Sequence, residues 1–66
     1  MEAHQQRVVD EKSELADKHE KLKVFIDESP IYAGLPDAEK KRLVRQSLYM
    51  ALYSNVLDER IDAFLS

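Results

Sequence analysis

The chain has 66 residues and a formal net charge of -3, with 35% charged and 44% hydrophobic residues. It contains one glycine, two prolines and no cysteine, which excludes disulfide bonds and cysteine-ligated metal sites and favours long helices. A chain of this length is close to the lower limit for a self-sufficient core, so oligomerisation is the expected source of additional stability. No apolar run approaches the ~18 residues of a membrane span, and the opening MEAHQQR lacks an apolar signal-peptide core. We therefore expect an intracellular, cytoplasmic protein without a membrane segment.

The first predicted element is an amphipathic helix from about residue 3 to residue 28, a span without glycine or proline. Its apolar residues form a narrow stripe with the spacing of a coiled-coil seam. The stripe consists of Val8, Leu15, Leu22 and Ile26, with Phe25 on its flank. His4 and His19 fall on the same face, but no carboxylate-histidine spacing of a known metal site accompanies them. We interpret His19 as a residue at the edge of the seam whose ring nitrogen reaches water.

Residues 29–36 are predicted to form a short connection. The residue before a proline is pushed out of the α region, so Ser29 ends the first helix and caps a short helical turn that begins at Pro30. We expect this turn to close at Gly34 in a left-handed conformation. Three apolar side chains are expected to fold inward over the end of the hairpin: Ile31, Tyr32 and Leu35. A short connection makes the two long helices antiparallel neighbours.

The second long helix is predicted from about residue 37 to residue 65, and its apolar residues occupy two stripes on roughly opposite sides. The first stripe consists of Leu43, Met50, Leu57, Ile61 and Phe64. The second consists of Val44, Leu48, Ala51, Leu52 and Val56, with Tyr49 and Tyr53 on one side between the two stripes. A helix that is apolar on nearly every side is normally buried on nearly every side.

The narrow seam of the first helix can cover only one of these stripes. Leaving the other in water would cost ~1.5–3 kcal/mol per aliphatic side chain. We therefore predict an all-α fold in which residues 1–66 form a single antiparallel two-helix hairpin that dimerises into a four-helix bundle. The predicted dimer or partner interface comprises Val44, Leu48, Leu52, Val56, Tyr49 and Tyr53. The alternative is that the second stripe receives a different protein.

Charges on the second helix oppose its own dipole, because it begins basic and ends acidic. The basic residues are Lys40, Lys41, Arg42 and Arg45, and the acidic ones are Asp58, Glu59 and Asp62. In the folded hairpin we expect the basic start to lie beside Glu20, Asp27 and Glu28, and the acidic end near Arg7 and Lys12. The basic start could also contact phosphates. A solvated helix surface is the preferred interpretation, since no interleaving of aromatic and basic residues accompanies the cluster.

Nothing in the sequence predicts catalysis. The acids have the spacing of helix-surface ion pairs, no nucleophile stands in an elbow motif, and there is no glycine-rich phosphate loop. We expect a protein that is not an enzyme and needs no cofactor or metal.

Two segments carry a resemblance to a known family. Residues 6–15 read QRVVDEKSEL, and the later pattern of Tyr53, Val56, Leu57, Arg60 and Ile61 reads Y-x-x-V-L-x-x-R-I. With Lys21-Leu22, Phe25-Ile26, Gln46 and Met50, this pattern resembles a family of small phage and prophage proteins described by relation to a crAss-like phage reading frame. The resemblance spans nearly the whole chain and implies a phage origin, but it assigns no functional residue.

Our first functional hypothesis is a phage-encoded interaction module that binds and modulates a host protein, such as a component of antiviral defence. Its candidate contacts are Tyr49, Tyr53, Arg45 and the 29–36 connection. The second is a small nucleic-acid-associated regulator that uses the basic residues at the start of the second helix. The third is a structural component of a phage assembly.

Overall fold

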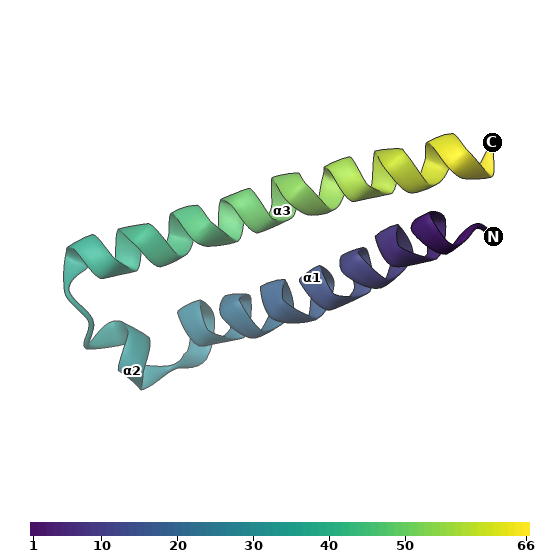
Figure 1. Ribbon diagram of the computed structural model, residues 1–66. Coiled ribbons are helices and arrows are strands. Elements are labelled where there is room, and N and C mark those ends of the chain that lie inside the picture. Colours follow the sequence, from purple (N-terminus) through teal and green to yellow (C-terminus); the bar gives the residue numbers. More distant parts are fainter.

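The computed structural model describes residues 1–66 and contains three helices and no strand. These are α1 (Ala3–Glu28), α2 (Pro30–Ala33) and α3 (Asp37–Leu65). Figure 1 shows α1 and α3 lying side by side and antiparallel, with α2 at the bend and both termini at the opposite end. The molecule is a rod with extents of 46 × 14 × 14 Å. The predicted all-α hairpin is therefore confirmed.

Local hydrogen bonds explain where the helices begin and end. At the start of α1, the side chain of Gln5 accepts a hydrogen bond of 2.9 Å from the backbone N–H of Glu2, which is half of a capping box. At its end, the Ser29 backbone N–H donates to the Phe25 carbonyl at 3.1 Å. The Ser29 hydroxyl then accepts from the Ile31 N–H at 3.1 Å, so one serine ends α1 and caps α2.

The left-handed conformation expected at Gly34 was wrong. Gly34 has φ -87° and ψ -3°, which is right-handed, and no residue of the chain has a positive φ. The N–H of Gly34 donates to the Ile31 carbonyl at 3.1 Å, and the N–H of Leu35 donates to the Tyr32 carbonyl at 3.0 Å. These tight bonds satisfy the last carbonyls of α2, so the turn closes without a left-handed residue.

The core is a single seam between the two long helices. Val8 and Leu15 of α1 and Leu57 of α3 are the buried residues, and Leu57 has no exposed surface at all. Three partly buried side chains pack against them: Met50, Ile61 and Phe64. The first stripe of α3 therefore faces α1, as its spacing predicts.

The connection covers the end of the hairpin only in part. The Tyr32 ring packs edge-on against Phe25, with 6.0 Å between the ring centres, and the Lys40 amino group lies 5.8 Å from the Tyr32 ring centre. The expectation that Ile31 also folds inward was wrong, because its side chain is 68% exposed. Adjacent residues of a helical turn point about 100° apart, so the inward position of Tyr32 turns Ile31 outward.

Two polar contacts join the long helices. Lys12 of α1 forms an ion pair with Asp58 of α3, in agreement with the predicted pairing at the acidic end of α3. Nearer the middle of the rod, His19 Nε2 lies 3.0 Å from the Ser47 hydroxyl. His19 therefore lies at the seam as predicted, and its Nε2 contacts a serine of α3.

The expected pairing at the basic start of α3 was wrong. No ion pair joins this end of α3 to Glu20, Asp27 or Glu28 of α1. Glu20 pairs with a neighbour in its own helix, and Arg42 likewise pairs with Glu39 at 2.7 Å. Oppositely charged side chains three residues apart are neighbours on the surface of one helix. These ion pairs within a helix replace the ion pairs expected between helices.

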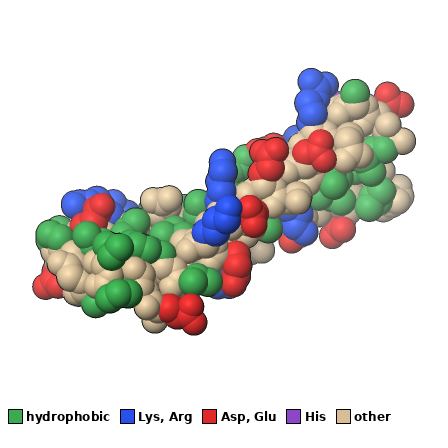
Figure 2. All heavy atoms as spheres, turned by 90° about the horizontal axis from the view of Figure 1, so that it is seen from below, with side chains coloured by type: hydrophobic (Ala, Val, Ile, Leu, Met, Phe, Trp, Pro, Cys, Tyr) green, Lys and Arg blue, Asp and Glu red, His purple; other side chains and the backbone are tan.

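The surface on the side of α1 and α2 carries scattered charges and one apolar end. Figure 2 shows basic and acidic side chains scattered along the rod, while hydrophobic side chains gather most densely at the end that carries α2. Ile31 is an exposed member of that end.

Candidate functional site

The most distinctive surface of the protein is the outer face of α3, which we define by the six residues predicted as an interface. Each is between 45% and 59% exposed. They are Val44, Leu48, Tyr49, Leu52, Tyr53 and Val56. They follow one another at helical spacing over a length of about 18 Å, with Val44, Leu48 and Leu52 on the side of α3 away from Leu57 and the other three turned toward one flank. The fold therefore brings all six together on one surface, and their role as an interface stays a prediction.

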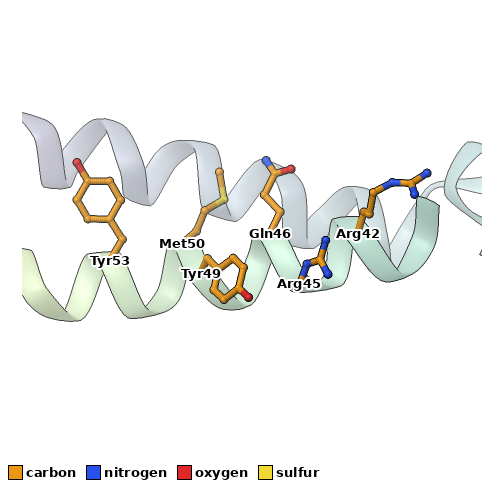
Figure 3. Close-up of a pocket in the computed structure, with 6 residues that line it drawn as sticks. All are labelled: Arg42, Arg45, Gln46, Tyr49, Met50 and Tyr53. Carbon is orange, nitrogen blue, oxygen red and sulfur yellow. The ribbon is translucent and has the colours of Figure 1, made fainter. Parts of the chain in front are cut away.

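A shallow groove of about 420 Å³, here called the tyrosine groove, runs along one flank of this face. Its lining residues are Arg42, Arg45, Gln46, Tyr49, Met50 and Tyr53. Figure 3 shows the side chains of Arg42, Gln46 and Tyr53 pointing across toward α1, while Arg45 and Tyr49 lie over the α3 ribbon itself. The groove thus combines aromatic surface with two guanidinium groups.

A second groove of about 390 Å³, here called the lysine groove, lies on the other flank near the connection. Its lining residues are Tyr32, Lys40, Lys41, Val44, Arg45 and Leu48. Arg45 lines both grooves and so stands between them. All four residues of the predicted basic cluster therefore lie beside the outer face of α3.

This arrangement revises the sequence interpretation, in which aromatic and basic residues did not interleave. In the structure, Tyr49 and Tyr53 share a groove with Arg45, and Tyr32 lies under Lys40. Sequence reasoning also missed Gln46 as a groove residue. The interleaving of aromatic and basic residues does have a signal in the sequence. Arg45, Tyr49 and Tyr53 are spaced four residues apart, which places them in one row along a helix.

Some charged side chains around the outer face have a partner within the chain, and others have none. Arg42 is bonded to Glu39, and Lys40 lies over the Tyr32 ring. Lys41 and Arg45 make no ion pair, and at the other end of α3 neither do Glu59 and Asp62. One chain therefore has unpaired cations and unpaired anions at opposite ends of the same helix.

The histidines and carboxylates do not form a metal site. No group of three or more potential metal ligands converges in the structure. His4 is exposed in the first turn of α1, and His19 is engaged with Ser47. None of the helices combines the length and the apolarity needed to cross a bilayer.

Comparisons with known proteins place the chain in a family. Neither the curated proteins nor the solved structures contain a match. A family model does match, over residues 2–63, and its description is Sequestin. This description contains no reference to the crAss-like phage reading frame that the two sequence segments resemble. Because the match covers nearly the whole chain, the protein belongs to the Sequestin family.

Proposed function

We propose that this protein is a sequestering module, which binds a target in the tyrosine groove on the flank of α3 and withholds it from its usual partners. The family name, Sequestin, is consistent with a sequestering role. The observation that carries the proposal is the tyrosine groove, in which the rings of Tyr49 and Tyr53 lie beside two guanidinium groups. Tyrosine and arginine are the residues that most often dominate binding energy at protein interfaces.

The proposed target is a host protein, bound in the cytoplasm of a bacterial cell during phage infection. We propose a phage origin because residues 6–15 and the Tyr53 to Ile61 pattern resemble those of small phage proteins. A component of antiviral defence is the class of target proposed, and binding would inhibit it by covering its working surface. We further propose that the protein acts as a homodimer, because the outer face of α3 exposes more apolar surface than a stable lone hairpin should leave in water.

The proposed activity is binding without chemical conversion. The grooves contain arginine, lysine, tyrosine, glutamine and aliphatic side chains. No carboxylate or histidine lines either groove, so neither contains the usual general base beside a nucleophile.

A second candidate target is a phosphate-bearing ligand, either nucleic acid or a nucleotide. The observation that favours it is the pair of unpaired cations, Lys41 and Arg45, next to tyrosine rings. Guanidinium groups bind phosphates with two parallel hydrogen bonds, and aromatic rings stack on bases. The groove volumes, about 420 and 390 Å³, lie within the range of small-ligand sites, roughly 300–1,000 Å³.

Affinity capture with matched variants tests the proposal. Tagged parent protein, Tyr53→Ala and Arg45→Ala would be incubated with a bacterial lysate, and retained proteins and nucleotides would be identified by mass spectrometry. Lys21→Ala is the control, because Lys21 is an exposed α1 residue that pairs only with Asp17 of its own helix. Circular dichroism would verify that each variant keeps its helices.

The two targets predict different results. If the target is a host protein, one protein is retained by the parent and by Lys21→Ala and is lost from Tyr53→Ala. If the target bears phosphate, nucleic acid or a nucleotide is retained instead, its affinity falls steeply with added salt, and Arg45→Ala abolishes its retention. The proposal is refuted if both groove variants retain the same molecules as the control.

A further inference from the structure

We infer that the outer face of α3 binds a second copy of the chain in an antiparallel arrangement, with a two-fold axis that passes beside Leu52. The inference rests on the proposed homodimer and specifies its geometry and the contribution of each copy to the binding site. The apolar residues supply the first observation. Leu48 and Val56 stand four residues before and after Leu52, and all three are 51% to 55% exposed.

A two-fold axis at Leu52 pairs these residues with one another. In an antiparallel helix pair, residues equally distant from the axis on either side face each other across the interface. Leu52 then faces the partner's Leu52, and Leu48 faces the partner's Val56. The apolar strip is therefore complementary to itself, as a two-fold interface requires.

The unpaired charges fit the same register. Arg45 stands seven residues before Leu52 and Glu59 seven residues after it, so each Arg45 faces the partner's Glu59. Lys41 stands eleven residues before Leu52 and Asp62 ten after it, so these two also come together across the interface. None of these four residues has an ion pair within one chain.

Charge also disfavours the parallel alternative. A parallel pair would place Arg45 beside the partner's Arg45 and Glu59 beside the partner's Glu59, and like charges at such contacts are destabilising. The antiparallel pair has a second advantage. It gives four of the charges that oppose the dipole of their own helix, Lys41, Arg45, Glu59 and Asp62, a partner of opposite sign.

The arrangement enlarges the binding site. Tyr49 and Tyr53 lie on the same flank of the strip, together with Arg42. A two-fold axis perpendicular to the helices keeps that flank on the same side of the assembly in both copies. The two tyrosine grooves therefore open on the same side of the assembly, one contributed by each copy. A lone chain contains only half of this site.

Introduced cysteines test the register directly, because the chain has none of its own. Helices pack with their axes about 8–10 Å apart and their Cα atoms lie about 2.3 Å from the axis, so facing Cα atoms can approach to roughly 4–5 Å. That separation permits a disulfide. We expect Leu52→Cys to form a covalent species of twice the 7.7 kDa chain mass under mild oxidation. A mixture of Leu48→Cys and Val56→Cys should form the mixed disulfide in preference to either homodisulfide, whereas Ser13→Cys, exposed on α1, should form very little.

Charge reversal supplies a test without cysteine. Arg45→Glu and Glu59→Arg should each raise the dimer dissociation constant roughly tenfold, because each creates two like-charge contacts. The double variant should return to within about twofold of the parent value, since both contacts regain opposite charges. Sedimentation equilibrium measures all three constants.

The outcomes separate this inference from the proposals on which it rests. A dimer that forms no disulfide at Leu52→Cys, or that the double reversal fails to restore, would overturn the antiparallel register while leaving the homodimer intact. A parent protein that is monomeric at all accessible concentrations would overturn the homodimer as well. Target capture by such a monomer would still support sequestration.

Discussion

The two faces of α3 consist of similar side chains but are used differently. On the inner face, Leu57 is fully buried against α1, and Ile61 packs beside it. On the outer face, Leu48 and Leu52 are about half exposed. The difference arises because α1 presents a single narrow stripe, which can cover only one side of its neighbour. The number of apolar residues on α3 thus shows how much of its surface needs a partner. The width of the apolar stripe on α1 determines how much of that surface α1 can cover.

The largest expected effect comes from the inner face. Leu57→Ala should destabilise the hairpin by about 2–5 kcal/mol, because it removes the only fully buried side chain and leaves a cavity in a seam with few other contacts. Urea unfolding followed by circular dichroism measures this loss. Leu65→Ala is the control, since that leucine is 65% exposed and should change stability little. Equal midpoints for the two variants would contradict the assignment of the core.

The corresponding change on the outer face should act on association. Leu52→Asp places a charge at the centre of the proposed interface, so we expect a monomer whose melting temperature no longer rises with protein concentration. The cost per chain should approach the ~1.5–3 kcal/mol of one aliphatic side chain returned to water. Sedimentation and thermal melting measure both. If the variant sediments and melts like the parent, the outer face is not an interface.

A smaller effect is expected at the polar contact within the seam. Ser47→Ala removes the partner of His19 Nε2, a bond of 3.0 Å between α1 and α3. The loss should be about 0.5–1.5 kcal/mol in urea unfolding, the usual net contribution of one hydrogen bond. Ser13→Ala, on the exposed surface of α1, should by comparison be nearly neutral. A Ser47→Ala midpoint equal to that of Ser13→Ala would show that the contact contributes nothing.

The smallest effect is expected in the connection between the two helices. A Cβ atom added at Gly34 would lie 3.7 Å and 3.8 Å from the nearest carbonyl oxygens, which is ordinary contact, and the backbone there is right-handed. Gly34→Ala should therefore stabilise the hairpin by about 0.4–1 kcal/mol, because alanine restricts the unfolded chain. Thermal melting measures the change. A clear loss of stability would mean that Gly34 needs a conformation available only to glycine.

The fold could be predicted from the sequence because it depends on helical periodicity and on breakers. The inner stripe around Leu57 and the stop at Ser29-Pro30 are both local patterns. The contact between His19 and Ser47 could not be predicted, because it depends on the sliding register of one helix against the other. The expected pairing of the basic start of α3 with acids of α1 failed because it depends on the same register. Arg42 instead bonds Glu39, three residues away in its own helix.

The candidate site could be predicted only in part. The six residues of the outer face could be named from spacing, because two opposite stripes cannot both face one helix. The grooves could not, because they depend on how side chains such as Gln46 and Tyr53 extend over α1. Side-chain directions of this kind depend on rotamers and on the neighbouring helix, which a helical wheel does not represent.

The thickness of the rod has a consequence for how such a protein could hide a captured molecule. At 14 Å across, the hairpin has no interior beyond its own seam. Anything held by one chain remains open to solvent on at least one side, where a receptor or enzyme could still reach it. A bound molecule is therefore hidden effectively only when a second copy covers its open side, and the space between the two copies would set how large a molecule can be concealed.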